Sequence, residues 1–257
     1  MNRTTFFRCR RCLLLLILCA LSASFARADE IHVAVASNFR QAFSAAADRF
    51  EEQSGHEVTL IAGSTGKHYA QILNGAPFDA FFAADAARPV RLESERRIVP
   101  GSRYTYAIGK LVLWSADESL VDARGDVLQS GSYCYLAIAN PELAPYGVAA
   151  RQVLQTLGLW DGLSHKLVRG ENIGQAFQFV VTANAELGFV ARSQLETPGQ
   201  EFGGSAWEPP PSLYDPIEQQ AVLLKDSPAG REFMTFMQGK EARALIRAYG
   251  YDVPDVQ

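Results

Sequence analysis

Short apolar runs alternate with longer amphipathic stretches along most of the chain. The first run, IHVAVA at 31–36, has the length of a buried strand, and apolar side chains recur after it at helical spacing. Those side chains are Phe39, Ala42, Phe43, Ala46 and Phe50. Gly55 is expected to end this helix, because glycine readily takes the left-handed conformation found after a last helical turn. Repeated alternation of strands and helices predicts an α/β architecture.

The same pattern predicts the remaining elements. Strands are expected at 58–62, 78–84, 104–116, 133–139, 187–191 and 221–226. Helices are expected at 67–73, 85–96, 148–157 and 172–182, and twice more after 226. The proline-rich segment WEPPPSLYDP at 207–216 is expected to be an irregular loop.

Two stretches are expected to cross between halves of the molecule, one near 105–115 and one near 218–224. A chain that leaves one lobe, builds a second and returns forms two α/β lobes with a cleft between them, and ligands favour such clefts. The predicted division places residues 29–108 and 220–257 in lobe I, and residues 109–219 in lobe II.

The N-terminus has the pattern of a secretory signal peptide over residues 1–28. A basic region precedes an apolar run at 12–21, and residues 26–28 form a small-x-small cleavage site. The apolar run is too short to span a membrane. We therefore expect a secreted chain that begins directly after the cleavage site. Cys19 is a candidate for lipid attachment, but the bulky Leu18 before it argues against a lipoprotein.

Charge and cysteine content narrow the function. Removing residues 1–28 takes away five of the 24 basic residues and none of the acidic ones, which leaves 19 basic against 28 acidic residues and a net charge of −9. An acidic chain is a poor candidate for binding nucleic acid or an anionic membrane. Cys134 is the one remaining cysteine, and its apolar run YCYLAIA predicts that it is buried. None of the four histidines has metal-ligand spacing, and each is expected to be at the surface or hydrogen-bonded.

Four turns that precede helices share small or polar residues. They are loop 1 at 36–38, loop 2 at 63–66, loop 3 at 145–147 and loop 4 at 171–174. Each turn by itself fits an ordinary helix cap. As a set they suit an anion, because the first amides of a helix lack partners and carry the positive end of its dipole. Loop 2 is too short for a nucleotide phosphate loop, since only two residues separate Gly63 from the Gly-Lys pair.

Longer motifs carry a resemblance across essentially the whole secreted chain. They are VAVASNF, GSTGKHYAQILNGAPFDAFFAAD, RYTYAIGKLVLWSA, NPELAPYGVAA, GENIGQA and the terminal AYGY. The sequence resembles the periplasmic molybdate-binding proteins of ABC importers. This resemblance implies a type II periplasmic binding protein whose two lobes, each a mixed β-sheet flanked by helices, close on one molybdate or tungstate. It also implies a periplasmic monomer that delivers the anion to an inner-membrane ABC permease, without catalytic activity and without a cofactor.

The resemblance further implies which groups hold the oxyanion. The residues are Ser37, Asn38, Ser64, Thr65, Tyr146 and Ile173. Ser37 and Thr65 would donate hydroxyls, with Thr65 standing where relatives have serine and Ser64 supporting it. Backbone N–H groups would come from Asn38, Thr65, Tyr146 and Ile173. The metal atom would be bound only within the oxyanion, with no protein ligand of its own. Ala191 departs from the pattern, because some relatives place a tyrosine hydroxyl there.

A site made only of proton donors suits molybdate and tungstate, because both are fully deprotonated dianions at neutral pH. Hydrogenphosphate keeps one proton that would lack an acceptor, at a cost of about 1–3 kcal/mol. Sulfate has the same protonation state as molybdate, so only its smaller size can exclude it. The same fold could therefore serve sulfate, selenate or phosphate.

A secreted serine hydrolase that uses Ser37, Ser64 or Ser205 is the alternative from another class. It has less support, because the chain lacks the G-x-S-x-G turn of such enzymes. Lys67 is expected to be a solvated side chain of a first helical turn and not a ligand.

Overall fold

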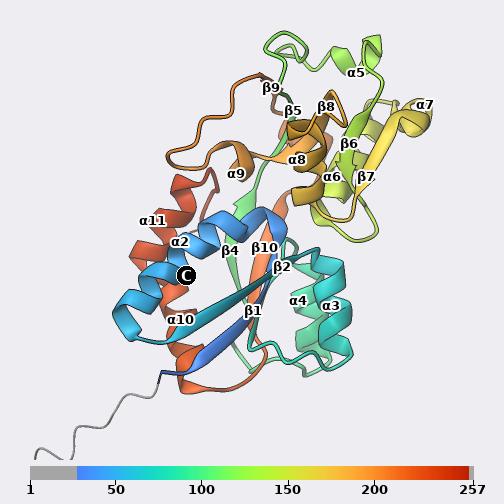
Figure 1. The fold of residues 1–257 in the computed structure, drawn as a ribbon. Coiled ribbons are helices and arrows are strands. Elements are labelled where there is room, and N and C mark those ends of the chain that lie inside the picture. The colour runs from blue at the N-terminus through green and yellow to red at the C-terminus, as the bar shows by residue number, and fades with distance from the viewer. Residues whose placement is uncertain (1–27, 255–257) are drawn as a thin grey trace, which may run out of the picture.

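The computed structural model describes residues 28–254, in which two β-sheets with helices on their faces form two lobes (Figure 1). The expected two-lobed α/β fold is thus confirmed. Apart from Ala28, the predicted signal peptide lies outside the described residues, and so does Cys19. Among residues 28–254, no helix is both long enough and apolar enough to cross a membrane.

Lobe I is built on a mixed five-stranded sheet with the order β2-β1-β3-β10-β4. Its strands are β1 (Glu30–Ala36), β2 (Glu57–Gly63), β3 (Ala80–Phe82), β4 (Tyr104–Gly109) and β10 (Ile217–Leu223). β1 pairs in parallel with β2 and β3, whereas β10 runs antiparallel to β3 and β4. The returning strand β10 therefore lies inside the first sheet.

Helices cover both faces of the lobe I sheet. They are η1 (Ser37–Phe39), α2 (Arg40–Ser54), α3 (Thr65–Leu73), α4 (Ala87–Ser94), α10 (Pro228–Gln238) and α11 (Lys240–Ala248). Successive residues of a strand face opposite sides, so Val33 and Val35 pack in the core with α2, α10 and α11, while Ala34 packs with α3 and α4. Gly55 ends α2 in the left-handed conformation, with φ of 73°, as the sequence predicts.

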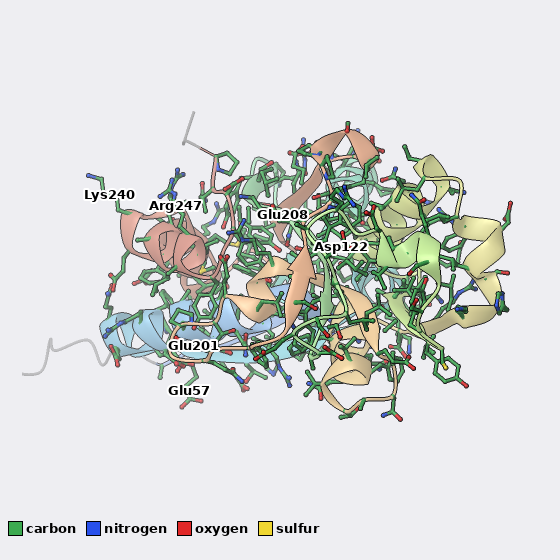
Figure 2. All side chains as sticks on the ribbon, turned by 90° about the horizontal axis from the view of Figure 1, so that it is seen from above. Glu57, Asp122, Glu201, Glu208, Lys240 and Arg247 are labelled. Atoms are coloured by element: carbon green, nitrogen blue, oxygen red, sulfur yellow. The ribbon has the colours of Figure 1, made fainter. Side chains whose placement is uncertain are left out.

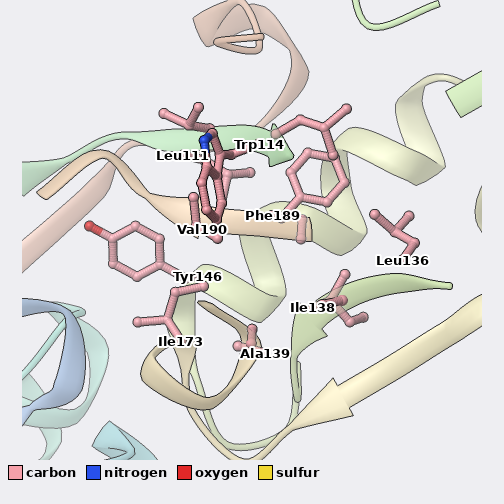
Figure 3. Packing of buried hydrophobic residues seen from close by; sticks show 14 of the residues in the cluster. Leu111, Trp114, Leu136, Ile138, Ala139, Tyr146, Ile173, Phe189 and Val190 are labelled. Carbon is pink, nitrogen blue, oxygen red and sulfur yellow. The ribbon is translucent and has the colours of Figure 1, made fainter. Parts of the chain in front are cut away.

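Lobe II contains a second mixed sheet with the order β7-β6-β8-β5-β9. Its strands are β5 (Leu111–Ser115), β6 (Leu136–Ala139), β7 (Leu167–Gly170), β8 (Leu187–Ala191) and β9 (Ser205–Trp207). Its helices and helical turns are α5 (Val127–Ser130), α6 (Pro145–Thr156), α7 (Trp160–Leu163), η2 (Ser164–Lys166), α8 (Ile173–Val181), α9 (Arg192–Leu195) and η3 (Pro211–Leu213). Figure 3 shows Trp114, Leu136 and Phe189 in the buried core of this lobe, which also includes Tyr146 and Ile173.

The chain passes between the sheets at Lys110. β4 ends in the first sheet at Gly109 and β5 begins in the second at Leu111, so the long extended run predicted at 104–116 is two strands. The return passes through η3 and enters β10, which pairs only within the first sheet among the described residues. The lobe boundaries given above stay a prediction.

The prediction that Cys134 is buried is wrong, because this thiol is exposed. The strand expected at 133–139 begins only at Leu136. The backbone N–H groups of Cys134 and Tyr135 instead bond to the carboxylate of Glu186, at 3.3 and 2.9 Å. Apolar composition placed this segment in the sheet, but a side-chain acceptor holds it outside.

The outer surface carries the charges that composition predicts. Figure 2 shows Glu57 and Lys240 projecting away from the body of the molecule, and both are exposed. Such solvated charges contribute little to the fold.

Candidate anion-binding site

The four loops lie at the carboxyl ends of parallel strands. In lobe I the last paired residues of β1 and β2 are Ala36 and Gly63, which are the first residues of loops 1 and 2. In lobe II the last paired residues of β6 and β7 are Ala139 and Gly170, and the chain continues from there to loops 3 and 4. Since neighbouring parallel strands end at the same edge of a sheet, the two loops of each lobe are neighbours.

Contacts between the lobes bring these pairs of loops together. The N–H of Gly66 in loop 2 donates to the carbonyl of Leu143, just before loop 3, at 2.8 Å. The N–H of Gly174 in loop 4 donates to the Ser37 hydroxyl of loop 1 at 3.3 Å. The four loops therefore meet where the lobes face each other, and the structure is closed.

Lys67 takes part in this closure. Its side chain is 52% exposed, in keeping with a solvated group, but Nζ lies 2.5 Å from a carboxylate oxygen of Glu171. Lys67 belongs to α3 of lobe I, and Glu171 belongs to loop 4 of lobe II. The pair thus bridges the two lobes, a contact that the sequence did not predict.

Loop 2 presents a hydroxyl and an amide from buried residues. Ser64 and Thr65 are each 1% exposed. Ser64 caps α3, because its Oγ accepts from the N–H of Lys67 at 3.2 Å. The Oγ1 of Thr65 accepts from the N–H of Ala84 at 3.1 Å, which leaves the Thr65 hydroxyl proton free to donate. Within residues 28–254, no acceptor is found for the Thr65 N–H itself.

The helices that begin in loops 3 and 4 also leave a backbone N–H in their first turn without a partner among the described residues. In α6, Pro145 has no N–H, and Gly147 donates to the carbonyl of Ala144 at 2.9 Å. In α8, Gly174 donates to Ser37, and Gln175 donates to the side chain of Asn172 at 3.1 Å. In the described part of the chain, Tyr146 and Ile173 are the residues of these two first turns whose N–H groups have no acceptor.

Loop 1 contributes Ser37 and Asn38. The two hydrogens of the Asn38 side-chain amide donate to Gln219 Oε1 at 2.8 Å and to the Tyr251 hydroxyl at 2.9 Å. Both hydrogens of this side-chain amide are therefore used, and the backbone N–H is the donor of Asn38 that remains for a ligand. Ser37 accepts from Gly174, so its hydroxyl proton is free to donate.

No charged side chain belongs to this group of six residues, so the electrostatics come from the backbone. α3, α6 and α8 direct their N-termini, with the positive ends of their dipoles, toward the junction of the lobes. Burial raises the pKa of Tyr146 well above its usual value, so its hydroxyl stays neutral. The arrangement can bind an anion through neutral donors.

A cavity of about 340 Å³ opens beside loops 1 and 4 and is lined from both lobes. Ser37, Asn38 and Gly174 line it, together with Gln194 of α9. Thr65 and Tyr146 do not, so this cavity is the part of the cleft next to the site.

Ala191 ends β8 and is fully buried, so this position offers no hydroxyl to a ligand. Gln194 accepts from the N–H of Ala191 at 2.9 Å and donates to the carbonyl of Ile173 at 3.3 Å. It links the end of β8 to loop 4. No local sequence pattern indicates this role, because it depends on the contact of Gln194 with loop 4, 21 residues away along the chain.

His68 meets the expectation that each histidine is at the surface or hydrogen-bonded, but through one ring nitrogen only. It is 3% exposed; Nδ1 pairs with Gln71 Oε1 at 3.1 Å, and Nε2 has no partner within the described residues. The ring lies against Gly63 of loop 2. Burial lowers the pKa of His68, which keeps the ring neutral behind the loop.

The three serines of the hydrolase alternative have backbone partners. Ser37 accepts from Gly174, Ser64 accepts from Lys67, and Ser205 donates to Asp117 and accepts from Val121. Within residues 28–254, none of them is hydrogen-bonded to a histidine. The same range contains no group of three or more His, Cys, Asp or Glu residues that could hold a metal ion.

Known proteins share this sequence and fold. The chain is 51% identical over 234 residues to the molybdate-binding protein ModA of Azotobacter vinelandii, covering 90% of this chain and 93% of that protein. It is 48% identical over 229 residues to ModA of Rhodobacter capsulatus, covering 88% and 89%. The solved periplasmic molybdate-binding protein of Azotobacter vinelandii superposes with a TM-score of 0.85 at 44% identity, covering 88% of this chain and all of that one.

The model of the bacterial extracellular solute-binding protein family matches residues 31–252, which is most of the chain. The same span contains both sheets and all four loops. The chain belongs to the bacterial extracellular solute-binding proteins.

Proposed function

We propose that this protein captures molybdate in the periplasm and delivers it to an ABC importer, and that tungstate binds in the same site. The observation that carries this proposal is the set of donors at the junction of the lobes. The first turns of three helices each leave one backbone N–H without an acceptor in the described chain, and so does Asn38 in loop 1. Ser37 and Thr65 add hydroxyl protons. The close similarity to molybdate-binding proteins supports the choice of anion.

The donors suit a dianion whose oxygens are all acceptors. In the proposed complex, the hydroxyls of Ser37 and Thr65 and the backbone N–H groups of Asn38, Thr65, Tyr146 and Ile173 surround one oxyanion. Hydrogen bonds to a charged acceptor are about twice as strong as neutral ones, so a buried dianion needs no countercharge from lysine or arginine. Backbone donors are also fixed in position, and this favours an anion of one size.

Selection against phosphate and sulfate follows from different causes. Hydrogenphosphate carries a proton that finds no acceptor among these groups, and an unpaired buried donor costs about 1–3 kcal/mol. Sulfate is fully deprotonated but smaller, so it cannot reach all the donors of a rigid closed site. Size and charge hardly differ between molybdate and tungstate, and we expect the site to accept both.

The proposed activity is capture and transfer, not catalysis. The anion itself is the cargo, and the protein works as a secreted monomer without a resident cofactor. The closed form of the two lobes is the state that docks on the inner-membrane permease.

Isothermal titration tests this proposal. The protein is expressed as the full chain, purified from the periplasm and titrated with molybdate, tungstate, sulfate, selenate and phosphate. We expect one molybdate or tungstate per chain and at least about tenfold weaker binding of phosphate, in line with one unpaired buried group.

A matched pair of serine variants strengthens the test. Ser37→Ala removes a proposed ligand and should weaken molybdate binding. Ser119→Ala changes an exposed serine whose hydroxyl donates to Asp117, and it should leave binding unchanged. Tightest binding of sulfate, selenate or phosphate would assign another cargo. Hydrolysis of an ester by the wild type, lost in a serine variant, would replace capture with catalysis.

A further inference from the structure

A buried hydrogen-bonded cluster lies beneath loop 1, and we call it the Gln219 cluster. Its members are Asn38, Tyr106, Tyr146, Gln219 and Tyr251. All five are at most 5% exposed. Two of them, Asn38 and Tyr146, also belong to the proposed ligand set through their backbone N–H groups.

Gln219 is the centre of the cluster. Its Oε1 accepts from Asn38 Nδ2 at 2.8 Å and from the Tyr106 hydroxyl at 2.9 Å. Its Nε2 donates to the Tyr146 hydroxyl at 3.2 Å. Two donors on one atom and an acceptor beside the other fix the orientation of the amide. Gln219 also lies at an irregularity of β10, where the pairing with β4 shifts register between residues 219 and 220.

The cluster joins the two lobes. Asn38, Tyr106 and Tyr251 belong to lobe I, whereas Tyr146 belongs to α6 of lobe II. The carbonyl of Asn38 also accepts from Ser193 of lobe II, at 3.1 Å. These bonds across the interface require the closed arrangement of the lobes.

The Gln219 cluster is tightly packed against the end of β4, where the chain leaves lobe I. A Cβ on Gly109, the last residue of β4, would clash with the Tyr146 hydroxyl and the Gln219 amide. The cluster is therefore packed directly against the backbone at the point where the chain passes from lobe I to lobe II. A rotation of the lobes that moves α6 away from β10 would break the bond between Gln219 and Tyr146.

We propose that Gln219 is a positioning residue that couples closure of the lobes to the donor geometry of loops 1 and 3. This inference rests on the proposed function, because it concerns the same site. Gln219 holds the Asn38 side chain, which orients the Asn38 N–H, and it holds the Tyr146 ring, whose backbone N–H lies on the opposite lobe. A partly closed site would leave buried polar groups unpaired, so the cluster favours full closure around an anion of one size.

Tyr146→Phe tests the proposal, because it removes the hydroxyl and keeps the backbone N–H. Stopped-flow fluorescence measures the association and dissociation rates of molybdate. We expect dissociation to be about three- to tenfold faster, the effect of one buried hydrogen bond, with association changed less than about twofold. The affinity ratio of molybdate to sulfate should fall, since the site becomes less rigid. The melting temperature without ligand should not change, because the lost bond forms only on closure.

Two further variants separate positioning from packing. Tyr214→Phe removes another hydroxyl near the crossing, one that accepts from the N–H of Leu111 at 3.4 Å and lies outside the cluster, and it should behave as wild type. In a Gln219→Leu background, Tyr146→Phe should have no further effect on dissociation. If Gln219→Leu does not fold, the comparison of Tyr146→Phe with Tyr214→Phe still decides.

Each outcome supports or overturns the proposal. The proposal is overturned if Tyr146→Phe releases molybdate at the wild-type rate and keeps the wild-type selectivity. It is also overturned if the substitution lowers the melting temperature of the ligand-free protein as much as that of the molybdate complex. Failure of the wild type to bind any oxyanion of the panel removes the proposed function and this inference with it. Binding by the wild type with an unaffected Tyr146→Phe removes only this inference.

Discussion

Gly66→Ala should weaken molybdate binding while it strengthens the ligand-free fold. Gly66 lies in the first turn of α3, where its N–H donates to the Leu143 carbonyl of the other lobe at 2.8 Å. A Cβ at this position would lie 2.9 Å from that carbonyl oxygen, 3.1 Å from Leu143 Cα and 3.2 Å from the Arg88 guanidinium. The first two contacts cross between the lobes, so the clash exists mainly in the closed form.

The magnitude follows from these contacts. Overpacking of a tight interface costs about 1–3 kcal/mol, which corresponds to a molybdate Kd about five- to 150-fold higher. In the open form the same methyl group replaces glycine within a helix and adds about 0.5–1 kcal/mol of stability. Affinity and ligand-free stability should therefore change in opposite directions.

Isothermal titration and thermal unfolding without ligand measure the two effects. Gly162→Ala is the matched control, because Gly162 lies in the short helix α7 and an added Cβ meets nothing within 4 Å. The control should bind molybdate as the wild type does. A Gly66→Ala protein that folds normally and has a Kd within twofold of wild type would refute the assignment of this contact to the closed, ligand-bound state.

Three other changes test separate parts of the site. Thr65→Val removes a hydroxyl and leaves the Ala84 N–H without its acceptor. The loss of a hydrogen bond to a charged ligand, about 1.5–3 kcal/mol, should raise the molybdate Kd roughly ten- to 150-fold in titration. An unchanged Kd would exclude this hydroxyl as a ligand. In a double-mutant cycle, Lys67→Met and Glu171→Gln should show a coupling of at most about 1 kcal/mol in molybdate affinity, because both side chains are partly exposed. The coupling should vanish in high salt. A coupling that does not depend on salt would contradict a solvated ion pair. Burial lowers the pKa of His68 in the folded protein, so the unfolded chain takes up this proton at a higher pH. The free energy of unfolding should therefore fall as the pH drops below about 6.5, and denaturant titrations of His68→Leu should show a weaker fall. Identical pH profiles for the variant and the wild type would show that another group is responsible.

Many of the helices, strands and turns of this protein could be predicted from the local sequence. Strand 187–191 has the predicted bounds, α8 lies within the predicted 172–182, and Gly55 ends α2 as expected. These features depend on local periodicity and on glycine's access to the left-handed conformation, so neighbouring residues are sufficient to specify them. The four loops could be recognised for the same reason, since each precedes a predicted helix and contains small or polar residues.

Contacts between distant segments could not be predicted in this way. Cys134 sits in an apolar run yet is exposed, because the carboxylate of Glu186 takes up its backbone N–H. The strand β7 was not predicted, since LVRG is short and its composition does not indicate a strand. Its parallel pairing with β6 stabilises it as one.

The sequence by itself determined an α/β chain with four donor-rich turns and no charged ligand among them. Only the tertiary structure decided that these turns meet between two lobes and that Gln219 links Asn38 to Tyr146 beneath them. The physical reason is that helix periodicity and capping act over a few residues, whereas the meeting of loops 108 residues apart, as from Asn38 to Tyr146, depends on how the sheets pack and where the chain crosses.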